Sequence, residues 1–217
     1  MARKRYEINV WGTVLFLDLG STSITESQID QAVESVKDFV FEVDEVFSTY
    51  KEGAFDPWAV SGGFDPSGYV KGWAADVAAD VLVAAGVGHV QVNAAGDLAL
   101  RGGWFDSAAG VVKPWSIGVV NPDNRAEIVQ VYEITDGAIA TSGTYERGAH
   151  IHDPLNGLIA IGAKSATVVG PEGWLCDAMA TAVMVGGQDS AKWFGQPELA
   201  GYQVFAVNRH EQSAWSI

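Results

Sequence analysis

The chain has 217 residues, of which 48% are hydrophobic, and it contains 8 Trp and 25 Gly. This length and composition suit one globular domain with a sizeable core. The 13 basic and 27 acidic residues give a net charge of −14, which repels nucleic-acid phosphates and anionic membrane surfaces. Cys176 is the only cysteine, so neither an intrachain disulfide nor a thiolate metal cluster can form. We therefore expect a single domain over residues 1–217 that does not bind nucleic acid.

The N-terminal stretch MARKRYEINVWGTVLFLDLG has a basic start but no signal-peptide core, because Glu7, Asn9 and Asp18 interrupt its apolar residues. Its segment INVWGTVLFLDL (8–19) is predicted to form one strand. No stretch of the sequence is long and apolar enough to span a membrane. We expect a cytoplasmic protein, although an extracytoplasmic chain trimmed of its leader would look the same.

Three helices are predicted. The segment 22–48 repeats apolar residues every three or four positions, and Thr25 with Gln28 forms a capping box. KGWAADVAADVLVAAG (71–86) is the second helix and ends at a glycine, and Asp76 and Asp80 are assigned to its polar face. EGWLCDAMATAVMVGG (172–187) is the third helix, and 189–197 is a candidate fourth.

The other segments are predicted to be strands and turns. HVQVNAAGDLALRGG (89–103) is a strand with a glycine turn, and GYQVFAVN (201–208) is a closing strand. Between 113 and 170, short runs rich in β-branched residues alternate with turns, which is typical of antiparallel strands. Because helices and strands do not alternate regularly, the fold class is α+β: a mixed, largely antiparallel sheet packed with helices.

Asp177 and Thr181 lie four residues apart in the third predicted helix, and therefore on one face among Ala, Met and Val. One interpretation is structural: an acidic residue in the first turn favoured by the helix dipole, and a threonine bonded back to a carbonyl. The other is functional, because a carboxylate and a hydroxyl are two oxygen ligands for a hard cation such as magnesium. The spacing alone leaves both open.

Two further motifs carry chemistry. In FDPSGYVKGWAAD (64–76), Gly68 and Gly72 flank Lys71 where a loop becomes a helix, an arrangement that suits a phosphate but equally an ordinary turn with a solvated lysine. In ATSGTYERGAHIHDP (140–154), His150, His152 and Asp153 are candidate zinc ligands. The alternative to a zinc site is that one histidine belongs to a hydrogen-bond network and the other lies on the surface. The tight turn in NAAGD (93–97) shows no chemistry of its own.

In this order, eight stretches of the sequence resemble the FAD:protein FMN transferases, the ApbE family. They are VWGT, FSTY, GAFDP, DPSGYVKGWAAD, NAAGD, ATSGTYERG, HIHDP and CDAMATA. The resemblance implies an ApbE-like (T-fold-like) domain that needs Mg²⁺. It also implies cleavage of FAD, attachment of FMN to a Thr or Ser hydroxyl of an acceptor protein, and release of AMP. Some members of the family instead hydrolyse FAD to FMN and AMP.

The resemblance also implies roles for individual residues. Asp177 and Thr181 match the side-chain ligands for magnesium, and Gly68 matches a ligand that binds through its backbone carbonyl. The positions that match FAD contacts are Trp11, Tyr50, Ala54, Phe55, Asp56, Asp65, Lys71 and His152. A carboxylate such as Asp177, or His150 before the DP turn, would take the proton of the attacking hydroxyl.

The chain also departs from the family pattern. It is shorter than most members, only KE separates FSTY from GAFDP, Asn156 replaces the usual Thr, and Ala95 replaces a common Gly. Two other hypotheses stand beside the transferase. One is a non-catalytic FAD-binding protein, and the other is a zinc hydrolase built on the two histidines and Asp153.

Overall fold

The computed structural model of the protein describes residues 2–47, 68–144, 151, 153, 156, 158–209 and 213–217. Its helices are α1 (Glu26–Phe47), α2 (Val70–Ala84), α4 (Gly173–Gly186) and the 3₁₀ helices η2 (Gly187–Gly195) and η3 (Pro197–Leu199). Its strands are β1 (Ala2–Val10), β2 (Thr13–Ser21), β3 (His89–Ala94), β4 (Asp97–Arg101), β5 (Trp104–Asp106), β6 (Val111–Lys113), β7 (Trp115–Asn121), β8 (Asn124–Ile134), β9 (Gly137–Gly143), β10 (Ser165–Gly170), β11 (Gln203–Val207) and β12 (Ala214–Ser216).

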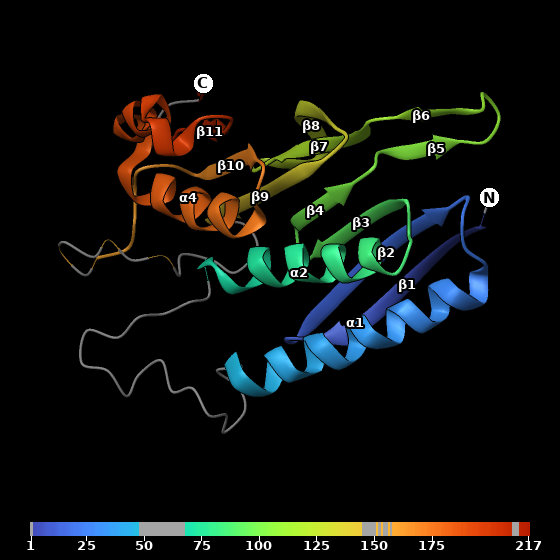
Figure 1. Ribbon diagram of the computed structural model, residues 1–217. Helices are drawn as coiled ribbons and strands as arrows, with labels where there is room; N and C mark the ends of the chain where they lie inside the picture. The colour runs from blue at the N-terminus through green and yellow to red at the C-terminus, as the bar shows by residue number, and fades with distance from the viewer. Residues whose placement is uncertain are drawn as a thin grey trace.

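One sheet dominates the structure (Figure 1). It has eight strands in the order β1-β2-β3-β4-β9-β10-β11-β12, and each neighbouring pair is antiparallel. The pairs β5–β6 and β7–β8 form separate two-stranded hairpins. The predicted α+β class with a largely antiparallel sheet is confirmed.

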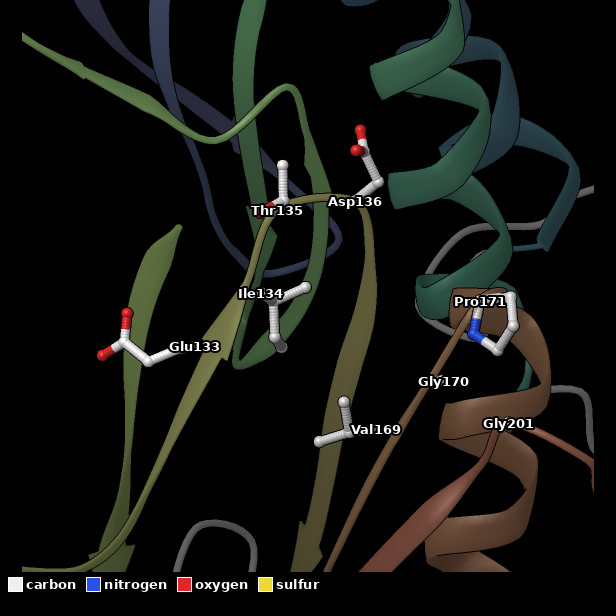
Figure 2. Close-up of a pocket in the computed structure, with 8 residues that line it drawn as sticks. All are labelled: Glu133, Ile134, Thr135, Asp136, Val169, Gly170, Pro171 and Gly201. Carbon is white, nitrogen blue, oxygen red and sulfur yellow. The ribbon is translucent and has the colours of Figure 1, made fainter. Parts of the chain in front are cut away.

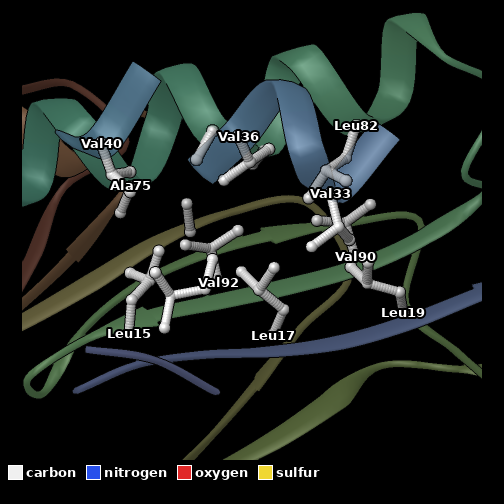
Figure 3. Packing of buried hydrophobic residues seen from close by; sticks show 14 of the residues in the cluster. Leu15, Leu17, Leu19, Val33, Val36, Val40, Ala75, Leu82, Val90 and Val92 are labelled. Carbon is white, nitrogen blue, oxygen red and sulfur yellow. The ribbon is translucent and has the colours of Figure 1, made fainter. Parts of the chain in front are cut away.

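Helices α1 and α2 cover the β1–β4 half of the sheet and bury its largest core. In Figure 3, Val33, Val36 and Val40 of α1 point toward the leucines of β2 and the valines of β3. Most of these side chains are fully buried. Each buried Val or Leu stabilises the fold by about 1.5–3 kcal/mol. Because α2 contributes Ala75, Ala78, Ala79 and Leu82 to the same core, this packing fixes its position on the sheet.

Helix α4 packs on the β9–β10 half of the sheet through a second core made largely of small residues. Ala138, Ala140 and Ala166 of the strands meet Ala180 and Met184 of the helix. The opposite face of β4 and β9 is covered by β7–β8, where Leu98, Leu100 and Ile139 pack against Trp115 and Ile134. The sheet is thus enclosed on both faces in this half, because successive strand side chains point to opposite sides.

The segment 8–19 was predicted as one strand, and this prediction is wrong. The chain turns at Trp11 and Gly12, which have φ values of 56° and 67°, so the segment contributes to both strands of the β1–β2 hairpin. The buried side chains change from even positions in β1 (Ile8, Val10) to odd positions in β2 (Leu15, Leu17, Leu19). The sequence hides this change, because the apolar Phe16 continues the even positions although its side chain is 46% exposed. Trp is also not a residue that favours positive φ, so Gly12 is the one recognisable turn residue.

Other predictions of local structure hold. The capping box of α1 is confirmed: the Thr25 N–H donates to Gln28 Oε1 at 3.0 Å, and the Gln28 N–H donates to Thr25 Oγ1 at 3.3 Å. The predicted turn between β3 and β4 is formed by Ala95 and Gly96, both with positive φ. The candidate helix at 189–197 is instead the 3₁₀ helix η2. Within the described part of the chain, no helix has the length and apolar character needed to cross a membrane.

Candidate active site

The site is built where α2 crosses α4, and two glycines make the crossing close. A Cβ atom on Gly72 would lie 2.2 Å from the carbonyl oxygen of Gly173, and one on Gly173 would lie 2.8 Å from the carbonyl oxygen of Gly72. Real side chains do not tolerate such distances to backbone atoms, so both positions need glycine. The crossing brings the start of α2 against the first two turns of α4.

Asp76 of α2 holds the N-terminus of α4 in place. Its Oδ2 accepts hydrogen bonds from the N–H groups of Gly173 at 2.6 Å and Trp174 at 3.4 Å. Arg101 Nη2 lies 3.4 Å from Asp76 Oδ1 and 3.0 Å from Asp80 Oδ1. Burial raises the pKa of Asp76, although the N–H groups and Arg101 oppose the shift. The prediction that Asp76 lies on a polar face of its helix is therefore wrong. Its side chain caps the N-terminus of the neighbouring helix α4.

Asp177 is a buried carboxylate, only 3% exposed, in the second turn of α4. The Gly72 N–H donates to its Oδ2 at 3.3 Å, and Lys71 Nζ lies 3.7 Å from the same oxygen. Burial, followed by the negative charge of Asp97, raises the pKa of Asp177 to about 7, while Lys71 and the Gly72 N–H lower it. The interpretation as a first-turn acid favoured by the helix dipole is wrong, because α4 begins at Gly173 and has no acidic residue in its first turn.

Lys71 bridges two carboxylates. It forms an ion pair with Asp97 as well as its contact with Asp177, and its side chain is 23% exposed. The alternative of a solvated lysine is therefore wrong. Sequence reasoning missed Asp97, which is buried at the start of β4 on the same face as Ala99. A usable signal existed, because alternation places this carboxylate on the buried face of its strand, where charge is costly.

Thr181 meets two other segments through its hydroxyl. Its Oγ1 lies 3.0 Å from the Oγ of Ser142 near the end of β9. A Cβ atom on Gly68 would lie 2.9 Å from the same Oγ1, so the backbone just before α2 also approaches the hydroxyl. The structure therefore brings Gly68, Lys71, Asp177 and Thr181 into one cluster. Ser142 is a second residue that sequence reasoning missed.

The remaining predicted site residues are elsewhere or outside the described ranges. Trp11 lies at the β1–β2 turn and packs against the core under α1 and α2. Its Nε1 is buried and has no hydrogen-bond partner in the described structure. The residues outside the described ranges are Tyr50, Ala54, Phe55, Asp56, Asp65, His150 and His152.

The zinc hypothesis receives no support from the described residues. Asp153 accepts a hydrogen bond from Asn156 Nδ2 at 2.7 Å, and its backbone N–H donates to the Leu158 carbonyl at 2.7 Å. Over the described ranges, no three His, Cys, Asp or Glu side chains are grouped so that they could hold a metal ion. Both histidines of the motif lie outside those ranges, so the hypothesis stays a prediction.

A surface hollow of about 450 Å³ lies toward the other end of β9, at the ends of β8 and β10 (Figure 2). Its lining residues are Glu133, Ile134, Thr135, Asp136, Val169, Gly170, Pro171 and Gly201. None of them belongs to the cluster around Asp177. Asp136 Oδ1 instead accepts the N–H of Gly102 at 2.8 Å, a bond that secures a turn. This hollow is therefore separate from the cluster at the crossing of α2 and α4.

The fold is that of solved ApbE structures. The Thermotoga maritima ApbE protein superposes with a TM-score of 0.80 over 99% of this chain and 96% of that one, at 20% identity. The flavin transferase ApbE from Vibrio cholerae gives a TM-score of 0.78 over 100% and 96% of the two chains, also at 20% identity.

The family follows from the sequence. The model of the ApbE family matches residues 7–205, so the chain belongs to the ApbE family and the predicted resemblance is confirmed. The FAD:protein FMN transferase of Vibrio cholerae is 33% identical over 135 residues, which cover 58% of this chain and 39% of that protein. The FAD:protein FMN transferase of Escherichia coli K12 is 30% identical over 153 residues, which cover 66% of this chain and 42% of that protein. The matches thus span about two fifths of these curated relatives.

Proposed function

We propose that the chain transfers FMN from FAD to a Thr or Ser hydroxyl of an acceptor protein, releases AMP, and needs Mg²⁺. Membership of the ApbE family and relatives named FAD:protein FMN transferase support the substrate and the acceptor class. The observation that carries the proposal is Asp177, a buried carboxylate that contacts Lys71 and the start of α2. Burying a charge is costly, and perturbed carboxylates of this kind concentrate at functional sites.

The donor set of the cluster fits Mg²⁺. The Asp177 carboxylate, the Thr181 hydroxyl and the Gly68 carbonyl are all oxygen ligands, which Mg²⁺ prefers, and they leave positions for substrate phosphates. Both of these contacts from α2 to Asp177 engage Oδ2, and the carboxylate of Asp177 would hold the metal together with Thr181 and Gly68. When bound, Mg²⁺ neutralises charge on the pyrophosphate and on the leaving AMP.

Lys71 and the first turn of α2 form the proposed phosphate site. The N–H groups at a helix start point toward an anion, and Lys71 adds a positive charge at the same place. Asp97 secures the ammonium group of Lys71 through their ion pair. The flavin and adenine would contact Trp11 together with residues outside the described ranges: Tyr50, Ala54, Phe55, Asp56, Asp65 and His152.

The proton of the attacking hydroxyl is assigned to His150 or to a carboxylate, with Asp177 as the carboxylate candidate. In transfer, the acceptor oxygen bonds to the FMN phosphorus and the bond to the AMP oxygen breaks. In the alternative reaction, water replaces the acceptor and the products are FMN and AMP.

The cytoplasmic location stays a prediction.

The proposal is tested by incubating the protein with FAD and Mg²⁺, with and without an acceptor protein from a flavinylated system. AMP is quantified by chromatography, and attached FMN is detected by mass spectrometry of the acceptor. AMP release that needs the acceptor and yields covalent FMN supports the transferase, whereas equal AMP release without acceptor supports FAD hydrolysis. FAD binding that is insensitive to Mg²⁺, with no AMP under either condition, would show a non-catalytic flavin-binding protein.

A further inference from the structure

We propose that Ser142 is a positioning residue, which orients the hydroxyl of Thr181 toward the magnesium ion. This inference rests on the proposed function, because it assumes that Thr181 is a metal ligand. The Oγ atoms of the two residues lie 3.0 Å apart, a good hydrogen-bond distance for two hydroxyl groups. Neither the predicted ligand set nor the predicted FAD contacts include Ser142.

The chemistry of a hydroxyl ligand explains why it needs such a partner. A threonine hydroxyl has one proton and two lone pairs, and it binds a cation through a lone pair. Its proton must then be donated to an acceptor on another side. Ser142 Oγ is placed to accept this proton, while the Gly68 backbone approaches Thr181 Oγ1 as well. The contact with Ser142 therefore turns a lone pair of Thr181 toward the metal.

The fold holds Ser142 firmly enough for this task. Ser142 is in register with Ala166 of β10, which is itself paired with β11, whereas the ladder between β9 and β4 spans only Gly137 to Ile139. Groups on such rigid elements position their partners more accurately than groups on loops do. Thr181 is carried by α4, which packs on the same strands through the alanines of the second core.

The neighbouring residue Thr141 provides a matched control. Its Oγ1 lies 2.9 Å from Thr167 Oγ1, so it also belongs to a hydroxyl pair in the same strand. Because alternate side chains point to opposite faces, this pair lies on the side of the sheet away from α4. Breaking either pair removes one similar hydrogen bond, but only the Ser142 pair contacts a proposed metal ligand.

The test measures metal binding directly, without FAD. Binding of Mn²⁺ is followed by electron paramagnetic resonance and binding of Mg²⁺ by calorimetry. The set comprises the parent, Ser142→Ala, Ser142→Thr, Thr141→Val and, to mark the site, Asp177→Asn. We expect Ser142→Ala to weaken metal binding about tenfold, within the range found for partners of metal ligands. Ser142→Thr should restore the affinity, and Thr141→Val should lower the unfolding temperature but leave affinity within about twofold of the parent.

Two results would overturn the role of Ser142 alone: Ser142→Ala binding metal as the parent does, or Thr141→Val weakening binding equally. In both cases Asp177→Asn would still abolish binding, and the proposed function would stand. If Asp177→Asn binds metal as tightly as the parent, the metal site and the role of Ser142 both fail. Should Ser142→Ala not fold, Ser142→Cys, which keeps the volume but is a weak acceptor, replaces it with the same expectation.

Discussion

Helices α1 and α4 pack on the same sheet, yet different requirements account for their sequences. Helix α1 has one apolar face that is buried and one polar face, and Thr25 and Gln28 cap its own N-terminus. Helix α4 is apolar on nearly all sides but buries the carboxylate of Asp177, and Asp76 of α2 satisfies its first N–H group. One helix is explained by its local sequence, and the other by its neighbours.

This difference separates residues that serve packing from residues that serve chemistry. All buried side chains of α1 except that of Asp44 near its C-terminal end are apolar, and their burial stabilises the fold. Burial of Asp177 instead opposes ionisation, and the nearby charge of Asp97 adds to the cost. A residue that costs stability and sits beside a lysine at a helix start is best explained by function.

The largest expected effect is at the crossing of α2 and α4. Gly72→Ala should destabilise the protein by about 3 kcal/mol, because its Cβ would lie 2.2 Å from the Gly173 carbonyl oxygen. In an ordinary helix interior the same change stabilises by up to about 1 kcal/mol. Urea unfolding measures the difference, with the exposed Ser35→Ala on α1 as the control. A neutral or stabilising Gly72→Ala would show that the helices do not approach so closely.

A substitution in the core of α1 should affect stability without affecting the site. Val36 is fully buried, and Val36→Ala should cost about 2 to 3 kcal/mol through lost burial and the cavity left behind. Affinity for Mn²⁺ in the folded protein should match that of the parent. Weakened metal binding at a temperature where the variant is folded would contradict the separation of packing from chemistry.

Asp177→Asn should stabilise the metal-free protein, whereas Val36→Ala destabilises it. Since the folded-state pKa of Asp177 is raised from 3.8 to about 7, its ionisation costs stability as the pH rises through this window. The asparagine variant avoids that cost. We expect the variant to unfold at a higher temperature than the parent at pH 8 in EDTA, and we expect this gain to vanish near pH 4. If the variant and the parent are equally stable at both pH values, the surroundings of Asp177 do not oppose its ionisation.

The smallest effect is expected at the cap of α1. Thr25→Ala removes the side-chain acceptor for the Gln28 N–H and should cost about 1 kcal/mol. Because this cap is local, AMP release per folded molecule should not change. Thermal unfolding and the AMP assay, run on the same preparation, test both statements. Lost turnover in a folded Thr25→Ala protein would place α1 in the site after all.

Patterns that depend on neighbours in the sequence were predictable. The periodicity and capping box of α1 gave its bounds closely, and the spacing of Asp177 and Thr181 correctly placed them on one helical face. The β1–β2 turn was missed because Trp11 is a typical strand residue, and because the exposed Phe16 hides the change of the buried face from even to odd positions.

Contacts between distant segments were not predictable from local pattern. Gly72 and Gly173 are ordinary glycines in the sequence, and only the crossing of their helices shows why a side chain is excluded at both positions. Asp97 and Ser142 reach the cluster from two different strands, and their partners are set by sheet order and helix packing. The resemblance to a family identified ligands but not the residues that hold them.

The most direct test of the site is AMP release from FAD over a magnesium titration. The parent is compared with Asp177→Asn, Thr181→Val and the control Asp38→Asn, an exposed acid on α1. We expect Asp177→Asn to lose at least about a hundredfold in rate, because the metal loses its charged ligand. Thr181→Val should keep part of its activity and recover further at high Mg²⁺, and Asp38→Asn should match the parent. A folded Asp177→Asn protein that releases AMP at the parent rate would contradict the metal site at the crossing of α2 and α4.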